Sequence, residues 1–191
     1  MKIATILFFG SLLFLSSIVF GQEDVKFEQF LTEIGKANGE QLNRIIAREN
    51  RLFESTENVF HQYNAKFAQS LKERLKGNYT EGLRLLIWID EQCPDCQSNQ
   101  FNWVRYEIGC TLGTLKVYRL SREYILPLVT ENKPVQPRLK LIAQNNLAVN
   151  YFELKEYKNA LHYYHRSLDH YKRTKNWLMV ASMLNLSLIH I

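Results

Sequence analysis

The sequence carries a 39-residue repeat, and this repeat constrains the fold more than any other feature of the chain. Tyr79, Tyr118 and Tyr157 follow one another at this interval. A small residue follows each tyrosine after three positions, and a large residue follows after four more: Gly82, Ser121 and Ala160, and then Leu86, Ile125 and Tyr164. Because several columns in one shared register are hard to obtain by chance, we expect the chain to be built from copies of one structural unit.

A second set of columns lies upstream of the tyrosines and keeps the same spacing. It consists of residue pairs whose second member is always small: Gln69-Ser70, Ile108-Gly109, Leu147-Ala148 and Leu186-Ser187. Spacings of three and four residues keep each set on one helix face. The pattern therefore predicts a helical hairpin in each copy, with small residues where the two helices approach closely. Since one hairpin cannot bury its apolar face alone, the copies are expected to stack.

The clearest copy runs from Leu141 to Tyr171, and it resembles a tetratricopeptide repeat (TPR). The positions that match that family's alternation of small and large residues are Leu147, Ala148, Tyr151, Tyr157, Ala160, Tyr164 and Ser167. The copy from about Arg105 to Val129 fits fairly well. The copy from about Lys66 to Asp90 fits less well, since Glu73 stands where the family has a large apolar residue. The resemblance implies an all-α fold, a right-handed α-solenoid of antiparallel helical hairpins, with helices or turns longer than in the usual repeat.

The resemblance divides the chain into three parts. Residues 66–191 are expected to form TPR-like repeats, and the last repeat begins near Val180 and is truncated at Ile191. The final "LNLSLIHI" is apolar where a solenoid needs a polar cap, so we expect the chain to be a fragment of a longer protein. Residues 22–65 show helical periodicity outside the 39-residue register, for example at Phe27, Phe30, Leu31 and Ile34, and are expected to form an N-terminal cap or a degenerate hairpin.

Residues 1–21 have the parts of a secretory signal peptide. Lys2 precedes an apolar run from Ile3 to Phe20, and Val19 and Gly21 occupy the positions of a cleavage site. The protein is therefore expected to be exported, to the periplasm or another extracytoplasmic compartment. The alternative is an uncleaved anchor, since the run is close to the minimum length of a membrane span. Membrane contact is expected only through this segment or through a span beyond Ile191.

Cys93-Pro94-Asp95-Cys96 could be read alone as a redox dithiol or as half of a zinc site. The columns at Gly82, Leu86 and Ile89 instead predict a helix just before it. The motif then lies at a helix C-terminus, whose partial negative charge disfavours a thiolate. We interpret it as the turn between two repeats. In an exported protein Cys93 and Cys96 can form a disulfide, and a bond from one of them to Cys110 is left open.

Histidines are concentrated between residues 162 and 170. His162, His165 and Asp169 have a spacing that could hold a metal. The neighbouring packing residues Tyr164 and Leu168 favour solvent or inter-repeat positions for these histidines instead. With no nucleophile–base order and no phosphate-binding loop in the sequence, we predict neither enzymatic activity nor a cofactor.

The charges are interspersed along the chain. The formal net charge is +5, and no run of five or more like charges occurs. Because nucleic-acid binding needs a concentrated basic patch, no nucleic-acid partner is expected in this region.

The remaining candidate site is a binding groove. Asn146 and Asn185 are one repeat apart, each just before a large–small pair. In tetratricopeptide stacks the first helix of each hairpin lines a concave groove, where such asparagines can bond a ligand backbone. By the same resemblance the other residues facing the groove are Asn145, Val149, Phe152 and Glu153. The alternative is that these asparagines only bond within the stack.

Together these observations predict an exported TPR scaffold that binds a protein or peptide segment. The signal ending and the long-period repeats resemble the extracytoplasmic TPR regions of Bacteroidota signalling proteins, in which an output domain follows. This implies the N-terminal sensory or interaction part of a larger signalling protein. The alternatives are a free-standing periplasmic TPR adaptor and a thiol-disulfide oxidoreductase using Cys93 and Cys96.

Overall fold

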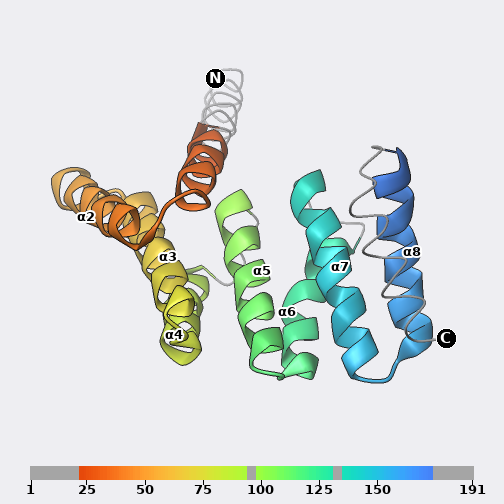
Figure 1. Ribbon diagram of the computed structural model, residues 1–191. Coiled ribbons are helices and arrows are strands. Elements are labelled where there is room, and N and C mark those ends of the chain that lie inside the picture. The colour runs from red at the N-terminus through yellow and green to blue at the C-terminus, as the bar shows by residue number, and fades with distance from the viewer. Residues whose placement is uncertain (1–21, 94–97, 131–134, 174–191) are drawn as a thin grey trace, which may run out of the picture. The chain divides into compact units, whose positions relative to one another are not determined.

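The computed structural model describes residues 22–93, 98–130 and 135–173, and these are built of helices and the turns between them (Figure 1). The helices are residues 22–34, α2 (Gly39–Thr56), α3 (Val59–Leu75), α4 (Tyr79–Gln92), α5 (Asn99–Thr114), α6 (Tyr118–Val129), α7 (Pro137–Glu153) and α8 (Tyr157–Arg173). The predicted all-α class is confirmed. Of the helices described, none combines the length and the apolar character needed to cross a bilayer.

The chain divides into two compact units, residues 1–101 and residues 102–191, here called the N-terminal and C-terminal units. The division falls inside α5, so the first turn of that helix belongs to the N-terminal unit. The predicted limits of the signal peptide, the 22–65 segment and the 66–191 repeats stay predictions. Residues 1–21 and the last predicted repeat lie outside the described residues.

Aromatic residues form part of the core of the N-terminal unit, in which α3 packs against both α2 and α4. The predicted stripe on helix 22–34 is buried through Phe27, Phe30 and Ile34. Phe27 stacks on Phe30 with ring centroids 5.7 Å apart, and Phe67 of α3 meets Phe27 edge-on at 5.8 Å. Burial of each such ring removes about 150–250 Å² from water, as is typical of phenylalanine, so these contacts hold helix 22–34 on α3.

In the C-terminal unit α7 packs between α6 and α8. Its inward face carries Leu139, Ala143, Leu147 and Ala148, all with no exposed surface. Leu139, Ala143 and Leu147 follow one another at intervals of four residues, which places them on one face of α7, and the predicted pair Leu147-Ala148 is buried with them.

Three of the turns between described helices share one backbone geometry. Gly77, Lys116 and Lys155 have left-handed φ angles of 86°, 62° and 63°. In each turn the backbone N–H of the next residue donates to the carbonyl five residues before it, at 2.9 Å: Asn78 to Glu73, Val117 to Leu112 and Glu156 to Tyr151. This bond and the left-handed residue define the Schellman motif that ends many helices.

The tyrosine column begins the helix that follows each of these turns. Tyr79, Tyr118 and Tyr157 are the first residues of α4, α6 and α8. The left-handed residue precedes the tyrosine by two positions in each case, so the turns recur at the same interval as the sequence repeat.

Small residues lie where paired helices approach most closely. A Cβ atom on Gly109 of α5 would stand 2.4 Å from Cγ1 of Ile125, and Ser121 Oγ donates to the Gly109 carbonyl at 2.6 Å. A Cβ atom on Gly82 of α4 would stand 3.1 Å from the Ser70 carbonyl oxygen of α3. The close approach predicted for these columns is confirmed at both places.

Candidate functional site

The predicted groove asparagines lie on α7 and bond to tyrosines of the neighbouring helices. Asn145 Nδ2 donates to the Tyr171 hydroxyl at 3.0 Å, and Asn146 Nδ2 donates to the Tyr106 hydroxyl at 2.6 Å. Asn146 Nδ2 also lies 3.4 Å from Cys110 Sγ. Burial, and then the neighbouring Cys110, raises the pKa of Tyr106 above its ordinary value, so this phenol stays neutral and can bond the amide. These two amides therefore join α7 to α8 and to α5.

The other predicted groove residues differ in exposure. Val149 is 39% exposed, and Glu153 is exposed one helical turn further along α7. Phe152 is half-buried, with its ring 5.5 Å from that of Tyr157. The pKa values of Tyr118 and Tyr164 are raised by burial first and then by the nearby Glu153 carboxylate. Val149 and Glu153 are thus the predicted side chains that a ligand could reach on α7, and Asn185 lies outside the described residues.

A shallow hollow of about 330 Å³ lies between the start of α7 and the end of α8. The charged residues of its lining are three basic ones, Lys140, Arg166 and Arg173, and one acidic one, Asp169. His162 and His165, which the sequence favoured for solvent or inter-repeat positions over a metal site, are exposed on α8, where the His162 ring packs edge-on against Tyr163 at 5.2 Å. Among the described residues, no three His, Cys, Asp or Glu side chains are close enough together to hold a metal ion.

Cys93, the first residue of the cysteine motif, lies where the sequence predicted it, at the end of a helix. Cys93 directly follows α4, and its backbone N–H donates to the Asp90 carbonyl at 3.3 Å. Cys93 is disulfide-bonded, and Cys110 carries a reduced thiol. Cys96, the partner predicted for Cys93, lies outside the described residues. The bond to Cys110 that the sequence left open is therefore not formed.

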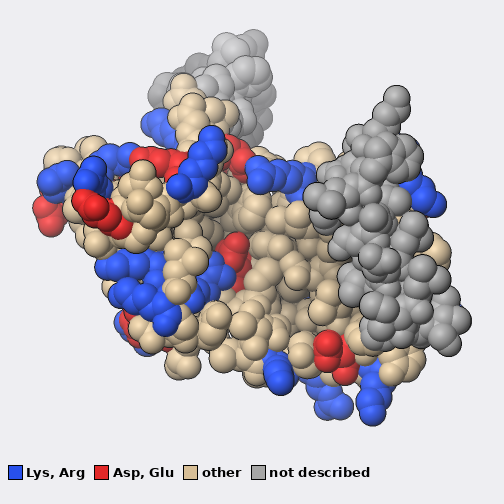
Figure 2. All heavy atoms as spheres, in the orientation of Figure 1, with Lys and Arg blue, Asp and Glu red and all other residues tan. Residues whose placement is uncertain are grey.

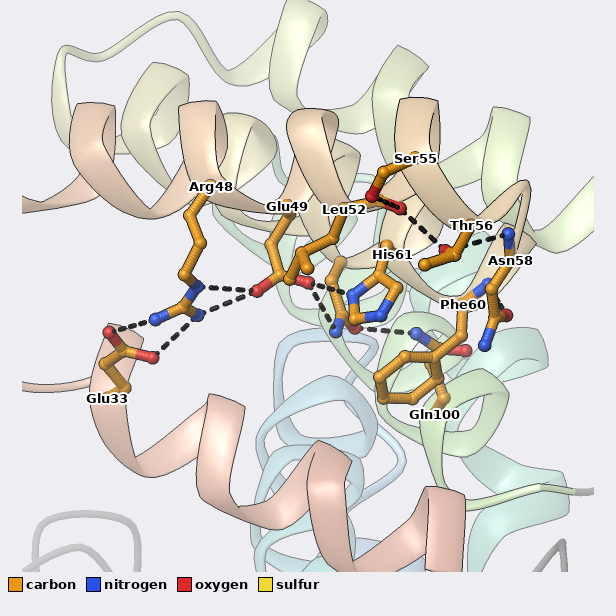
Figure 3. A network of polar contacts seen from close by, with 11 residues as sticks. Glu33, Arg48, Glu49, Leu52, Ser55, Thr56, Asn58, Phe60, His61 and Gln100 are labelled. Atoms are coloured by element: carbon orange, nitrogen blue, oxygen red, sulfur yellow. Dashed lines mark hydrogen bonds and ion pairs between the residues drawn. The ribbon is translucent and has the colours of Figure 1, made fainter.

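Sequence reasoning missed a polar network with a buried centre in the N-terminal unit (Figure 3). Its centre is Glu49 of α2, which is 3% exposed. Glu49 Oε1 accepts from Arg48 Nη2 at 2.7 Å, and Oε2 lies 2.7 Å from His61 Nδ1 of α3. Because a carboxylate can only accept, His61 Nδ1 carries the hydrogen of that bond. Asn64 Nδ2 donates to the same Oε2 at 3.3 Å.

The network extends to two further helices. Arg48 makes a bidentate pair with Glu33 of helix 22–34, at 2.8 and 2.9 Å. Gln100, in the first turn of α5, donates to Asn64 Oδ1 at 2.8 Å. The network therefore joins helix 22–34, α2, α3 and the start of α5 through polar contacts.

The carboxylate at its centre stays ionised because its partners outweigh its burial. Burial is the largest influence on Glu49 and acts to raise its pKa, but the hydrogen bonds from His61, Arg48 and Asn64 together lower the pKa below its ordinary value. The sequence did carry one signal for this residue. Glu49 lies four positions after Ile45 and three before Leu52, so a charged side chain occupies a place on the apolar face of α2.

The described residues thus hold a reachable α7 surface, a disulfide-bonded cysteine at a helix end and a buried ionic network that joins helices. The α7 surface could contact a ligand, whereas the ionic network holds helices together. Comparison of the chain with protein-family models, with curated proteins and with solved structures finds no match in any of the three.

Proposed function

We propose that this chain is an exported scaffold of TPR-like hairpins, arranged as a right-handed solenoid, that binds a protein or peptide segment and has no catalytic activity. The observation that carries the proposal is the set of matching turns at Gly77, Lys116 and Lys155. Since each turn joins a helix to one that begins with a column tyrosine, the 39-residue sequence period corresponds to a helix–turn–helix unit. Stacked units of this kind serve mainly as extended binding surfaces.

The α7 surface is the part of the scaffold proposed to contact the ligand. Val149 offers an apolar contact and Glu153 a charged one, and both are exposed. Asn145 and Asn146 attach α7 to its neighbours, because their amides donate to Tyr171 of α8 and Tyr106 of α5. In this proposal the two asparagines hold α7 in position, and the residues at 149 and 153 determine which ligand is bound.

The proposed location and biological context come from the sequence. The segment at residues 1–21 supports export, and the resemblance to extracytoplasmic TPR regions of Bacteroidota signalling proteins supports a sensory or interaction role there. The partner proposed is accordingly an extracytoplasmic protein or peptide.

Selection of peptides on the full chain tests the binding role. A phage-displayed library of random dodecapeptides is selected against the protein, and the enriched peptides are synthesised and titrated by fluorescence polarisation. Val149→Asp is expected to weaken their binding about tenfold or more, because it places a charge in the apolar part of the contact.

Leu161→Asp on α8 is the matched control, because Leu161 is 40% exposed and Val149 is 39% exposed. This substitution adds the same charge at an equally exposed site and is expected to leave affinity within about twofold. Failure to enrich any peptide, or an equal loss of binding in both variants, would count against the α7 surface.

A further inference from the structure

A basic pocket of about 540 Å³ lies in the N-terminal unit, between the end of helix 22–34 and α2. Its lining residues are Glu33, Lys36, Ala37, Gln41, Arg44, Ile45, Arg48 and Arg51. Figure 2 shows Lys and Arg side chains gathered over α2, at the left of the view, with acidic side chains among them. The pocket belongs to a different unit from the α7 surface.

The positive charges of the pocket are compensated unequally. Arg48 is paired with Glu33 and Glu49, and Arg44 is paired with Glu40 one turn before it on α2. Lys36 and Arg51 are exposed, and the described part of the chain places no acidic group against either of them. The pocket therefore keeps an excess of positive charge at Lys36 and Arg51.

The shape of the pocket suits a short length of extended chain. Arg44 and Arg51 are two turns apart on α2, which corresponds to roughly 10 Å at about 1.5 Å per residue. An extended peptide covers that distance with about three residues. Ala37 and Ile45 supply apolar lining between the charged groups. Arginine pairs with carboxylates through two parallel hydrogen bonds, so an acidic side chain of such a peptide fits the exposed Arg51.

We propose that this pocket binds an acidic peptide segment of a partner protein, with Lys36 and Arg51 pairing its Asp or Glu side chains and an apolar residue of the segment against Ile45. Glu33 and Glu40 lie at or beside the pocket and repel a dense polyphosphate, whereas carboxylates spaced along a peptide can avoid them. A concave pocket also fits a chain segment better than the flat surface of a membrane. This site goes beyond the binding role proposed for α7, because none of its residues belongs to that surface.

The test is a fluorescence-polarisation titration of the full chain with two synthetic octapeptides carrying a neutral dye. One peptide has Glu residues flanking a central Leu, and the other has Gln in place of every Glu. The acidic peptide is expected to bind at least about tenfold more tightly than the Gln peptide. Lys36→Gln combined with Arg51→Gln is expected to remove about tenfold of that affinity. Both side chains are exposed, so the variant should keep the circular dichroism spectrum of the parent protein.

Arg119→Gln combined with Lys158→Gln is the matched control, because it removes one Arg and one Lys from exposed positions on α6 and α8. It is expected to bind the acidic peptide as the parent does. The proposal is overturned if the two peptides bind equally, or if both double variants lose the same affinity, which would indicate attraction to net charge alone.

Vesicles of phosphatidylglycerol form the last arm of the experiment. Binding to these vesicles that depends on Lys36 and Arg51, without binding of the acidic peptide, would replace the peptide with a membrane surface and overturn the proposal. If the basic pocket fails this test, the binding role proposed for the α7 surface still stands, because its own test, Val149→Asp, alters neither Lys36 nor Arg51.

Discussion

The two units bury polar groups in different ways. In the N-terminal unit the buried Glu49 is ionised and is held by Arg48, His61 and Asn64. Its partners come from two helices, and Arg48 adds a third through Glu33. The helices here are joined by charge-assisted bonds, which need complete pairing because a buried ion without partners is costly.

The described residues of the C-terminal unit bury neutral polar groups instead. Asn150 of α7 donates to Ser121 Oγ at 2.8 Å, and Ser121 Oγ donates to the Gly109 carbonyl at 2.6 Å. All three residues are buried, and they lie where α5, α6 and α7 meet. This chain of bonds is short because Gly109 lets the backbone of α5 come close to α6.

The difference indicates that the helices are positioned by different means. Close backbone approach at small residues positions α6 against α5 in the C-terminal unit, as it does α4 against α3 in the N-terminal unit, and it follows a column of the sequence repeat. An ionic network positions helix 22–34 and α2, which the repeat register does not reach. The following predictions separate these two means, beginning with the largest effect.

Substitution Glu49→Ala should destabilise the protein by about 2 to 3 kcal/mol, because it leaves the buried Asn64 and the partly buried Arg48 and His61 without their acceptor. Urea unfolding followed by circular dichroism measures the loss. Hydrogen exchange should show reduced amide protection in α2 and α3, with protection in the C-terminal unit much less affected. Equal loss of protection in α7 would mean that the network is not confined to the N-terminal unit.

Glu40→Ala is the control for this experiment, because Glu40 also pairs with an arginine of α2 but its side chain is 74% exposed. It should cost about 0.5 kcal/mol or less.

The pH dependence of the free energy of unfolding tests the same Glu49 carboxylate in a second way. Since the folded pKa of Glu49 is lowered from 4.5, its stabilising contribution is present above that pH and is lost as the pH falls through the folded value. The Glu49→Ala variant should lack this part of the acid dependence.

Substitution Gly109→Ala should destabilise the C-terminal unit by about 1 to 2 kcal/mol. The added Cβ overlaps Ile125, and the free-energy cost of this overlap exceeds the gain in helix propensity from Gly to Ala. Gly113→Ala on the same helix is the control, since its nearest neighbour to an added Cβ is Ser121 Oγ at 3.5 Å. It should stabilise by about 0.5 to 1 kcal/mol. Thermal unfolding distinguishes the two signs, and a stabilising Gly109→Ala would contradict the close-approach account.

Substitution Gly77→Ala should cost about 1 kcal/mol, because its left-handed φ of 86° disfavours any side chain. Gly39→Ala is the control, since open space surrounds both glycines and Gly39 lacks the left-handed φ. Lys116→Gly and Lys155→Gly should instead stabilise by about 0.5 kcal/mol by relieving the same strain. If the three turns are alike, thermal unfolding of the four variants should show a lower melting temperature for Gly77→Ala and higher melting temperatures for Lys116→Gly and Lys155→Gly.

Much of the fold could be predicted from the sequence, because its signals are local. The tyrosine column predicted repeating hairpins, and these tyrosines are the first residues of α4, α6 and α8. The small columns predicted close helix contacts, as seen at Gly109 and Gly82. The Cys93 motif was placed at a helix end because the preceding residues kept helical spacing.

The candidate sites were predicted less completely. The groove residues could be named from their positions on α7, but their spacing did not show that Asn145 and Asn146 would bond to Tyr171 and Tyr106. Glu49 carried a local signal, a charge on an apolar face, but nothing in the sequence identified His61 and Asn64 as its partners.

The sequence by itself determined the helical class, the interval between the turns before α4, α6 and α8, and the positions of the small contact residues. Periodicity and turn formation depend on residues close together in the chain. Tertiary structure alone decided the partners of Glu49 and the gathering of Lys36 and Arg51 around one pocket. These depend on how helix 22–34, α2 and α3 are oriented to one another, and the packing of Phe27 and Phe30 of helix 22–34 on Phe67 of α3 contributes to that orientation.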